Sequence, residues 1–386
     1  MAAPYAEPAF KISPARFVKR IAFASAAIVA TNCSGDTAAD TPTPLLSEPW
    51  RLADKTADLY AASCPEGSVF ITPEDIGLTV DAVELYDADE TPPEVFAGLH
   101  YIGGFELESE DPRFGGLSGL AITRSGNLIA VSDAGHFVWI GLDEEDGFTP
   151  VSAALSDMKR QDGSPAETKS EVDAEGLAFA DGLALVSFEQ SHRISAFDLE
   201  TCGAAARAAP ITAFSSGSSF GVGKSVKTNG GIEGLAVGPS GGLAAGLETL
   251  IDGRAPMSFE ARDRVVDFDK RFADMDGRAL TGLDYLVDPQ DDDAGVLFAV
   301  HRSFNLLTGP NVAVTATPVF DRKPDMSAAR TLLILKRPQT VDNFEAIAAR
   351  RFEDGSVRLF ILSDDNYQPV QRTLLLAFDV APELSR

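Results

Sequence analysis

Polar side chains recur beside short apolar strands along this chain, at places where they could hold a cation. One stands just before the first strand of each of five segments: Ser118, Glu175, Glu233, Thr281 and Glu345. A second group ends the next strand: Asp133, Glu189, Glu248, His301 with Arg302, and Asp364 with Asp365. Carboxylate oxygens are the ligands that Ca²⁺ and similar hard cations prefer. The pattern therefore predicts a divalent-metal site, provided that the fold gathers the five segments.

The segments that carry these residues are internal repeats. Residues 116–133 recur as 174–189, 232–248 and 344–364, and a looser copy runs from Leu280 to Arg302. Each copy has two alternating apolar strands joined by a turn, which is typical of a β-hairpin. The first three copies lie about 58 residues apart, a spacing that suits four-stranded propeller blades with long outer loops.

We therefore predict an all-β fold, a β-propeller of five or six blades, forming one domain over residues 51–386. The β-rich flanks at residues 69–107 and 373–380 indicate that the two chain ends share one blade. A β-sandwich or a solenoid is the competing fold, but a solenoid would need a shorter and more regular period. Equivalent positions of successive blades face one axis, so the recurring carboxylates would form a ring.

The composition limits the partners of such a domain. Among 386 residues, 58 acidic side chains face 32 basic ones, for a formal net charge of −26. This charge repels nucleic acid and disfavours it as a ligand. It favours divalent cations, although acidic surfaces also serve solubility alone. We expect a small anionic substrate reached through a bridging cation, and a monomer.

The amino end resembles an export signal. Four basic residues between positions 11 and 20 precede the apolar run at 21–30, which is too short to span a bilayer. We predict a signal peptide at 1–32, a flexible tether at 33–50 rich in Thr, Pro, Ala and Asp, and a periplasmic or secreted protein. Cys33 raises the alternative of an outer-membrane lipoprotein, but the preceding Ala-Thr-Asn departs from the usual lipid-attachment pattern. No later stretch reaches membrane length.

Export also bears on the remaining two cysteines. In an oxidising compartment Cys64 and Cys202 could form a disulfide, and the alternative is two unrelated buried thiols.

Several strings resemble the phytase-like repeat family, which is named for the esterase-like activity of phytase. They are GLSGLAI…AVSDAG, DAEGLAF…SFEQ, NGGIEGLAV…GLE and, most specifically, DNFEAIA…LFILSDDNYQPVQRTLLLAF, and the resemblance covers about residues 95–382. It implies an exported bacterial protein with a propeller-like fold and phosphoester-cleaving activity. The acidic positions of the family fall on Asp133, Asp173, Glu175, Glu189, Glu233, Glu248, Asp342, Glu345, Asp364 and Asp365. Two positions depart from its pattern: His301 replaces a glutamate, and Ala346 replaces a glycine.

These residues suggest a Ca²⁺-dependent phosphoric ester hydrolase. Arg302 and Arg372 would neutralise the substrate, and His301 would act as general acid or base. Lys224 and Lys227 lie in a Gly-rich stretch that is either a phosphate-contacting loop or a solvated turn.

Other interpretations remain open. The acidic residues could only cap turns or join neighbouring blades, which would leave a non-catalytic propeller that binds a ligand or protein at the cell envelope. A metal-dependent lactonase would need Glu, Asp and Asn on one ion, with the asparagine drawn from Asn229, Asn305, Asn343 and Asn366.

Overall fold

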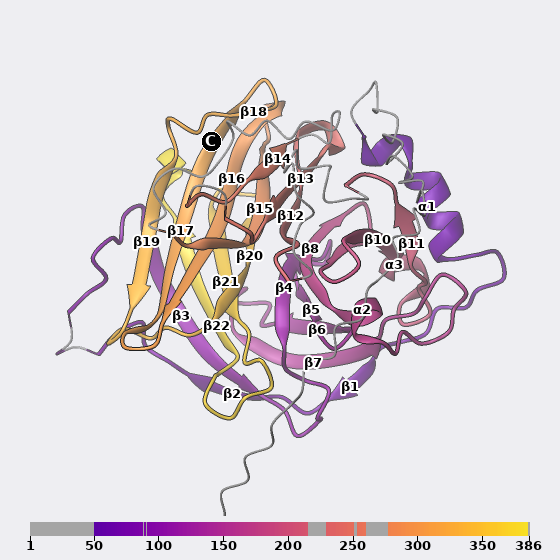
Figure 1. Cartoon of the computed structure of the whole chain (residues 1–386), viewed down its shortest axis with the longest axis horizontal. Helices are drawn as coiled ribbons and strands as arrows, with labels where there is room; N and C mark the ends of the chain where they lie inside the picture. Colours follow the sequence, from indigo (N-terminus) through magenta and orange to yellow (C-terminus); the bar gives the residue numbers. More distant parts are fainter. Residues whose placement is uncertain are drawn as a thin grey trace, which may run out of the picture. The chain divides into compact units, whose positions relative to one another are not determined.

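The strands that the structure describes form five antiparallel sheets (Figure 1). The strand at one end of each sheet is the first strand of one of the sequence repeats. The computed structural model describes residues 50–87, 89, 91–214, 229–250, 253–259 and 277–384. The predicted signal peptide, Cys33, the tether up to residue 49, Lys224 and Lys227 lie outside the described residues.

The first three sheets belong to the amino-terminal two thirds of the chain. The first has, in spatial order, β1 (Glu74–Ile76), β7 (Pro150–Asp157), β6 (His136–Leu142), β5 (Leu128–Ser132) and β4 (Leu117–Ile122). The second has β11 (Ala209–Ile211), β10 (Arg193–Asp198), β9 (Leu183–Phe188) and β8 (Ala174–Ala180). The third has β12 (Ile232–Val237), β13 (Leu243–Leu247) and β14 (Met257–Phe259).

The fourth sheet has β15 (Ala279–Asp288), β16 (Asp291–Asn305), β17 (Gly309–Phe320) and β18 (Lys323–Pro324), and β19 (Arg330–Lys336) also pairs with β17. The fifth has β2 (Thr79–Ala82), β3 (Leu99–Glu108), β22 (Leu374–Val380), β21 (Val357–Ser363) and β20 (Phe344–Arg351). The short helices are η1 (Leu52–Asp54), α1 (Thr56–Ser63), α2 (Lys169–Val172), α3 (Leu199–Cys202), η3 (Pro239–Gly241) and η4 (Pro382–Leu384).

The innermost strands close a ring. Strand β4 contacts β8, β8 contacts β12, β12 contacts β15, β15 contacts β20, and β20 returns to β4. The fold is thus a five-bladed β-propeller, which confirms the all-β prediction and sets the blade number at five. The fifth sheet joins β2 and β3 to β20, β21 and β22, so strands from both ends of the sequence share one blade, as the flanking strands predicted.

Hydrophobic side chains fill each of the five interfaces between neighbouring blades. A middle strand therefore packs on both faces, and every residue of β5 and β9 is buried. This explains why those strands are nearly continuous apolar runs in the sequence. Among the described residues, no helix has the length and apolar character needed to cross a bilayer.

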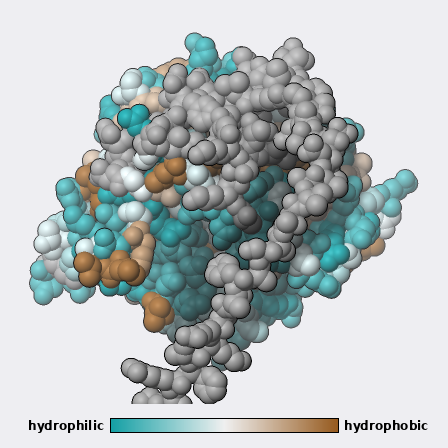
Figure 2. Space-filling view, viewed as in Figure 1, coloured by the Kyte–Doolittle hydropathy of each residue, from teal (hydrophilic) through white to brown (hydrophobic). Residues whose placement is uncertain are grey.

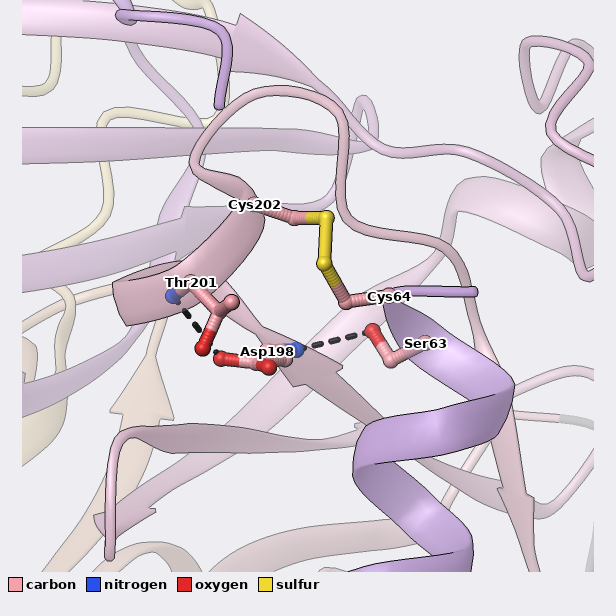
Figure 3. The surroundings of a disulfide bond; sticks show 5 residues. All are labelled: Ser63, Cys64, Asp198, Thr201 and Cys202. Carbon is pink, nitrogen blue, oxygen red and sulfur yellow. Dashed lines mark hydrogen bonds between the residues drawn. A yellow bond between two sulfur atoms is a disulfide. The ribbon is translucent and has the colours of Figure 1, made fainter. Parts of the chain in front are cut away.

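A disulfide joins the segment before the first blade to the second blade (Figure 3). Cys64 follows α1, Cys202 ends α3, and their Cα atoms lie 5.8 Å apart. The adjoining Ser63 hydroxyl accepts a hydrogen bond from the Asp198 amide at 2.8 Å. Of the two alternatives left open by the sequence, the structure has the bonded pair.

Candidate metal centre

The inner strand of every blade carries a β-bulge at its recurring polar position. In the first blade Leu117 pairs with Ser132 and Gly119 pairs with Val131, which leaves Ser118 as the extra residue. The same irregularity falls at Glu175, Glu233, Thr281 and Glu345 in the other blades. A bulge bends a strand and redirects a side chain, and bulges are common beside active sites. The same kind of β-bulge therefore positions all five polar side chains.

The strands come very close together just beyond these bulges. A methyl group on Gly119 would lie 2.5 Å from the Glu175 carbonyl oxygen, and one on Gly176 would lie 2.6 Å from that of Glu233. Deeper along the axis, leucine and isoleucine side chains from the inner strands leave a cavity of only about 10 Å³. The polar residues therefore stand at one end of an almost filled axis. On the face seen in Figure 2, the recessed surface near the centre is hydrophilic where it is visible.

Two overlapping groups of carboxylates have the spacing of metal ligands. One oxygen each from Asp173, Glu175 and Glu189 lie within 4.8 Å of one another, and the same holds for Glu189, Glu233 and Glu248. Asp173 precedes β8, Glu189 follows β9 and Glu248 follows β13, so the second and third blades supply both groups. Glu189 belongs to both. This arrangement could hold one or two divalent cations.

Burial and mutual repulsion disfavour the charged forms of these acids. Burial, followed by the neighbouring carboxylates, raises the pKa of Glu175 and of Glu233 well above the usual value. Burial also raises the pKa of Glu189 to about 7, although the Gly230 amide donates a hydrogen bond to Glu189 Oε1 and opposes the rise. Without a cation such a cluster retains protons, and a metal ion must displace them in order to bind.

Two basic side chains offset part of the negative charge. Lys169 Nζ in α2 lies 2.9 Å from Asp133 Oδ2 and 2.5 Å from Asp173 Oδ1. Arg302 in β16 places a guanidinium nitrogen 2.9 Å from Glu345 Oε1 and 3.7 Å from Glu248 Oε1. Among the described residues, the centre sets eight carboxylates against these two cations: Asp133, Asp173, Glu175, Glu189, Glu233, Glu248, Glu345 and Asp364. The centre therefore keeps a strong preference for added positive charge.

The fifth blade contributes a proton-holding pair beside Arg302. Burial and the adjacent Glu345 raise the pKa of Asp364 to about 9. Asp364 hydrogen-bonds Glu345, and Asn343 Nδ2 donates to Glu345 Oε1 at 2.8 Å. Glu345 is thus held by an arginine, an amide and a neighbouring acid, and burial together with mutual repulsion favours keeping a proton on this pair of acids.

Other predicted site residues lie apart from these groups. His301 is fully buried within its blade, its Nε2 is 3.3 Å from Thr315 Oγ1, and burial lowers its pKa to about 3. Asp365 accepts hydrogen bonds from the Gly116 and Tyr367 amides, which is the turn-capping alternative. Arg372 lies 3.5 Å from Asp342. Neither ligand group includes any of these residues.

Of the four asparagines considered for a lactonase, two hydrogen-bond carboxylates of the centre among the described residues: the Asn343 side chain binds Glu345, and the Asn366 main-chain amide donates to Asp364 Oδ1 at 2.6 Å. Asn305 caps its own hairpin turn by accepting a hydrogen bond from the Leu307 amide at 2.8 Å.

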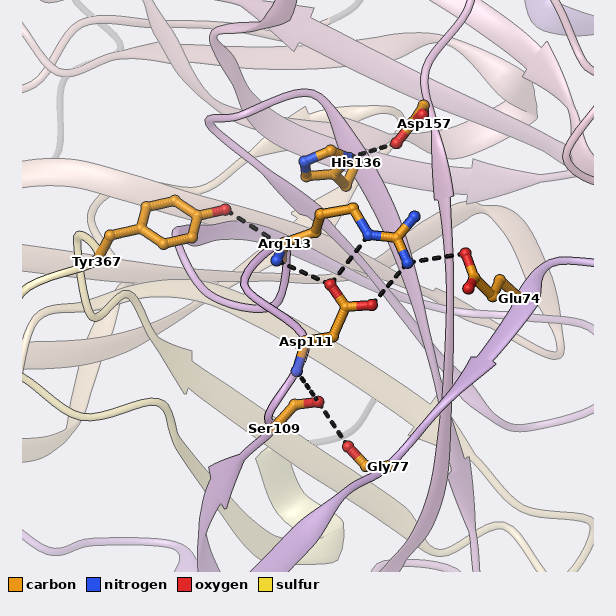
Figure 4. A network of polar contacts seen from close by, with 8 residues as sticks. All are labelled: Glu74, Gly77, Ser109, Asp111, Arg113, His136, Asp157 and Tyr367. Atoms are coloured by element: carbon orange, nitrogen blue, oxygen red, sulfur yellow. Dashed lines mark hydrogen bonds and ion pairs between the residues drawn. The ribbon is translucent and has the colours of Figure 1, made fainter.

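A second polar network borders the ring at the first blade (Figure 4). Arg113 pairs with Asp111 at 2.6 Å and with Glu74 at 2.8 Å, and His136 Nδ1 lies 3.0 Å from Asp157 Oδ1. Burial lowers the pKa of His136. The network is internally paired and supports the loops that it joins.

Sequence reasoning missed Lys169 and the bulges. The ion pair of Lys169 could have been predicted, because Lys169 stands four residues before Asp173, and this spacing places two charged side chains on one face of a helix. The bulges also had a signal, because a glycine follows the extra polar residue in four of the five inner strands, and a glycine inside a strand often marks a bulge.

Comparison with known proteins gives a family. The sequence profile of the family described as "Phytase-like: Esterase-like activity of phytase" matches residues 112–367. No match was found among curated proteins.

Three similar solved structures can be named. A putative oxidoreductase (glucose dehydrogenase) from Thermus thermophilus has a TM-score of 0.33 at 10% identity, covering 78% of this chain and 100% of its own. The WD40 β-propeller domain of Doa1 has a TM-score of 0.33 at 10% identity, over 73% of this chain and 97% of its own. Myxococcus xanthus glutaminyl cyclase has a TM-score of 0.26 at 20% identity, over 43% and 68% respectively. Structural similarities this weak give no information about the function of this protein.

Proposed function

We propose, starting from the fact that the chain belongs to the phytase-like family, that this protein is an exported hydrolase that cleaves phosphoric esters with a bound divalent cation, Ca²⁺. The observation that carries the proposal is the pair of buried carboxylate groups that share Glu189. Their donors are all oxygens, as Ca²⁺ requires.

The residues present fit such a cation. Asp173, Glu175 and Glu189 would hold one ion, and Glu189, Glu233 and Glu248 would hold a second. Asp133 Oδ1 is buried and has no hydrogen-bond partner among the described residues, which leaves a further oxygen lone pair at the edge of the centre. A bound divalent cation supplies polarisation of the phosphoryl oxygen and a lowered pKa for bound water.

The protein's own side chains complete the chemistry. Arg302 presents a guanidinium held by Glu345, and it would bind a non-bridging phosphoryl oxygen through charge-assisted hydrogen bonds. Burial and the adjacent Glu345 raise the pKa of Asp364, so it would hold a proton and donate it to the leaving-group oxygen. Lys169 would keep Asp133 and Asp173 in place while the substrate enters.

Export is part of the same proposal. It rests on the signal-like residues 1–32, and the Cys64–Cys202 disulfide supports it because such bonds persist in oxidising compartments. We place the mature protein in the periplasm or outside the cell as a monomer, with lipid attachment at Cys33 as the alternative.

The test is turnover by the metal-stripped mature protein with and without added Ca²⁺. Substrates are bis(p-nitrophenyl) phosphate and p-nitrophenyl phosphate, with an aryl lactone as comparison. We expect phosphoester cleavage that needs the cation. We expect Arg302→Lys to lower kcat/KM by roughly 10- to 100-fold, because a lysine cannot reproduce the forked contact.

Arg124→Gln is the matched control, since Arg124 pairs with Glu200 at 3.1 Å on an exposed part of the surface. Its kinetics should equal those of the parent protein. Calcium binding without turnover would instead support the non-catalytic binding protein, and turnover of the lactone alone would support the lactonase.

A further inference from the structure

A second cavity lies at the outer part of the second blade, separate from the metal centre. It has a volume of about 350 Å³ and lies between the connection at residues 158–171 and the strands β9 and β10. Its basic lining residues are Lys159, Arg160 and Arg193, and its apolar lining includes Phe188 and Phe197. No residue of the two carboxylate groups lines it.

Arg193 brings a positive charge into this cavity without a carboxylate to balance it. Its guanidinium donates hydrogen bonds to the main-chain oxygens of Ser170 at 2.7 Å and Glu171 at 2.6 Å, and to the Ser191 hydroxyl. It also stacks 3.7 Å from the centre of the Phe188 ring. Among the described residues, no acid lies within ion-pair distance of it. Burial lowers its pKa to about 10, and the nearby Glu171 carboxylate offsets only part of this effect.

The other two cations are also incompletely neutralised. Within the described parts of the chain, Lys159 forms no ion pair. Arg160 pairs with Glu171 Oε2 at 3.1 Å, but that oxygen already accepts hydrogen bonds from the Thr168 and Glu167 amides. Arg160 Nε is buried and has no hydrogen-bond partner among the described residues. The nearby Asp162 binds Ser164 in its own turn.

The cavity therefore holds three cations against one carboxylate, in a protein whose net charge is −26. We propose that it is a binding site for a small organic phosphate monoester. The phosphate would lie against Lys159, Arg160 and Arg193, and its apolar group would lie against Phe188 and Phe197. A dianionic phosphate matches the two positive charges in excess, and a guanidinium suits phosphate geometry.

This site is independent of the proposed hydrolase function. The main-chain oxygens of Ser170 and Glu171 face Arg193, whereas the Lys169 side chain of the same short helix contacts Asp133 and Asp173. The two sites therefore meet at α2 without sharing a ligand-binding residue. Phosphate binding can consequently be measured with the metal centre empty.

The experiment is calorimetric titration of the metal-free full chain with phenyl phosphate in the presence of a chelator. Without a cation the carboxylate centre repels phosphate, so binding reports on the cavity. We expect one site per chain, weaker binding of inorganic phosphate, which lacks the ring, and no measurable binding of phenol. The double variant Lys159→Gln/Arg160→Gln should raise the Kd at least tenfold, since it removes two charged contacts.

Two further variants keep the result interpretable. Arg193→Lys retains a charge but loses the forked contact, and it should also weaken binding, with folding checked by the melting temperature. Arg124→Gln removes a cation outside the cavity and should leave the Kd unchanged. Absence of phenyl phosphate binding, or equal affinity in the double variant, would overturn the proposal. Loss of hydrolase activity alone would not affect it.

Discussion

Replacing the shared ligand Glu189 by glutamine should have opposite effects with and without calcium. Glu189 is 7% exposed, and its pKa of about 7 compares with an ordinary value of 4.5. An acid whose pKa is raised by folding stabilises the folded state least at high pH. The metal-free protein thus loses stability as pH rises from 4.5 through 7. At pH 7 this shift corresponds to about 3 kcal/mol of unfolding free energy.

Glutamine cannot ionise, and its carbonyl oxygen can still accept the hydrogen bond from the Gly230 amide. The metal-free variant should therefore be more stable than the parent protein at pH 7, by up to about 3 kcal/mol, and equally stable near pH 4. With calcium the order should reverse. The parent protein gains about 4.1 kcal/mol when free calcium is one thousand times its Kd, which exceeds the advantage of the metal-free variant, and the variant lacks a ligand of both groups.

The assay is chemical or thermal unfolding at pH 4 and pH 7, with chelator and with Ca²⁺. Glu345→Gln is the matched control, because Glu345 lies in the same ring but pairs with Arg302 and belongs to neither ligand group. That variant should lower the stability of the metal-free protein and keep the calcium-induced rise. The reasoning fails if Glu189→Gln keeps the full calcium response, or if it destabilises the metal-free protein equally at both pH values.

Three further outcomes follow from the fold. Gly176→Ala should destabilise the protein by about 2 kcal/mol in urea unfolding, because its methyl group meets main chain, whereas Gly77→Ala, which meets nothing within 4 Å, should change stability by less than about 0.5 kcal/mol. The double variant Cys64→Ser/Cys202→Ser should lose up to about 5 kcal/mol, since the bond closes a loop of 138 residues; an unchanged urea midpoint would contradict this. Burial raises the pKa of Asp284 to about 7 from 3.8, so stability should fall as pH rises between these values, and Asp284→Asn should flatten that part of the unfolding-versus-pH curve.

The repeats in the sequence were enough to predict the blades and the shared closing sheet. Each hairpin has to bury two faces against its neighbours, so its apolar pattern repeats with every blade. The period also placed Glu175, Glu189, Glu233 and Glu248 near one axis, and the structure brings all four together.

The spacing of the sequence repeats could not predict the direction in which individual side chains point. His301 and Arg302 are neighbours in β16, and adjacent residues of a strand face opposite sides. One had to enter the ring and the other the blade, and the fourth repeat was too irregular to tell which. Asp364 and Asp365, which follow the end of β21, also point apart, the first toward Glu345 and the second toward the Gly116 amide.

The nearly filled axis determines how substrate and product can reach and leave the carboxylates. The cavity between the inner strands, lined by ring residues such as Glu233 and Glu345 and by leucines, has a volume of about 10 Å³ and accommodates at most a single water molecule. The inner strands therefore close the axis to larger molecules at this level. Whatever reaches the carboxylates has to depart through the opening by which it arrived. Incoming and outgoing molecules therefore compete for one passage.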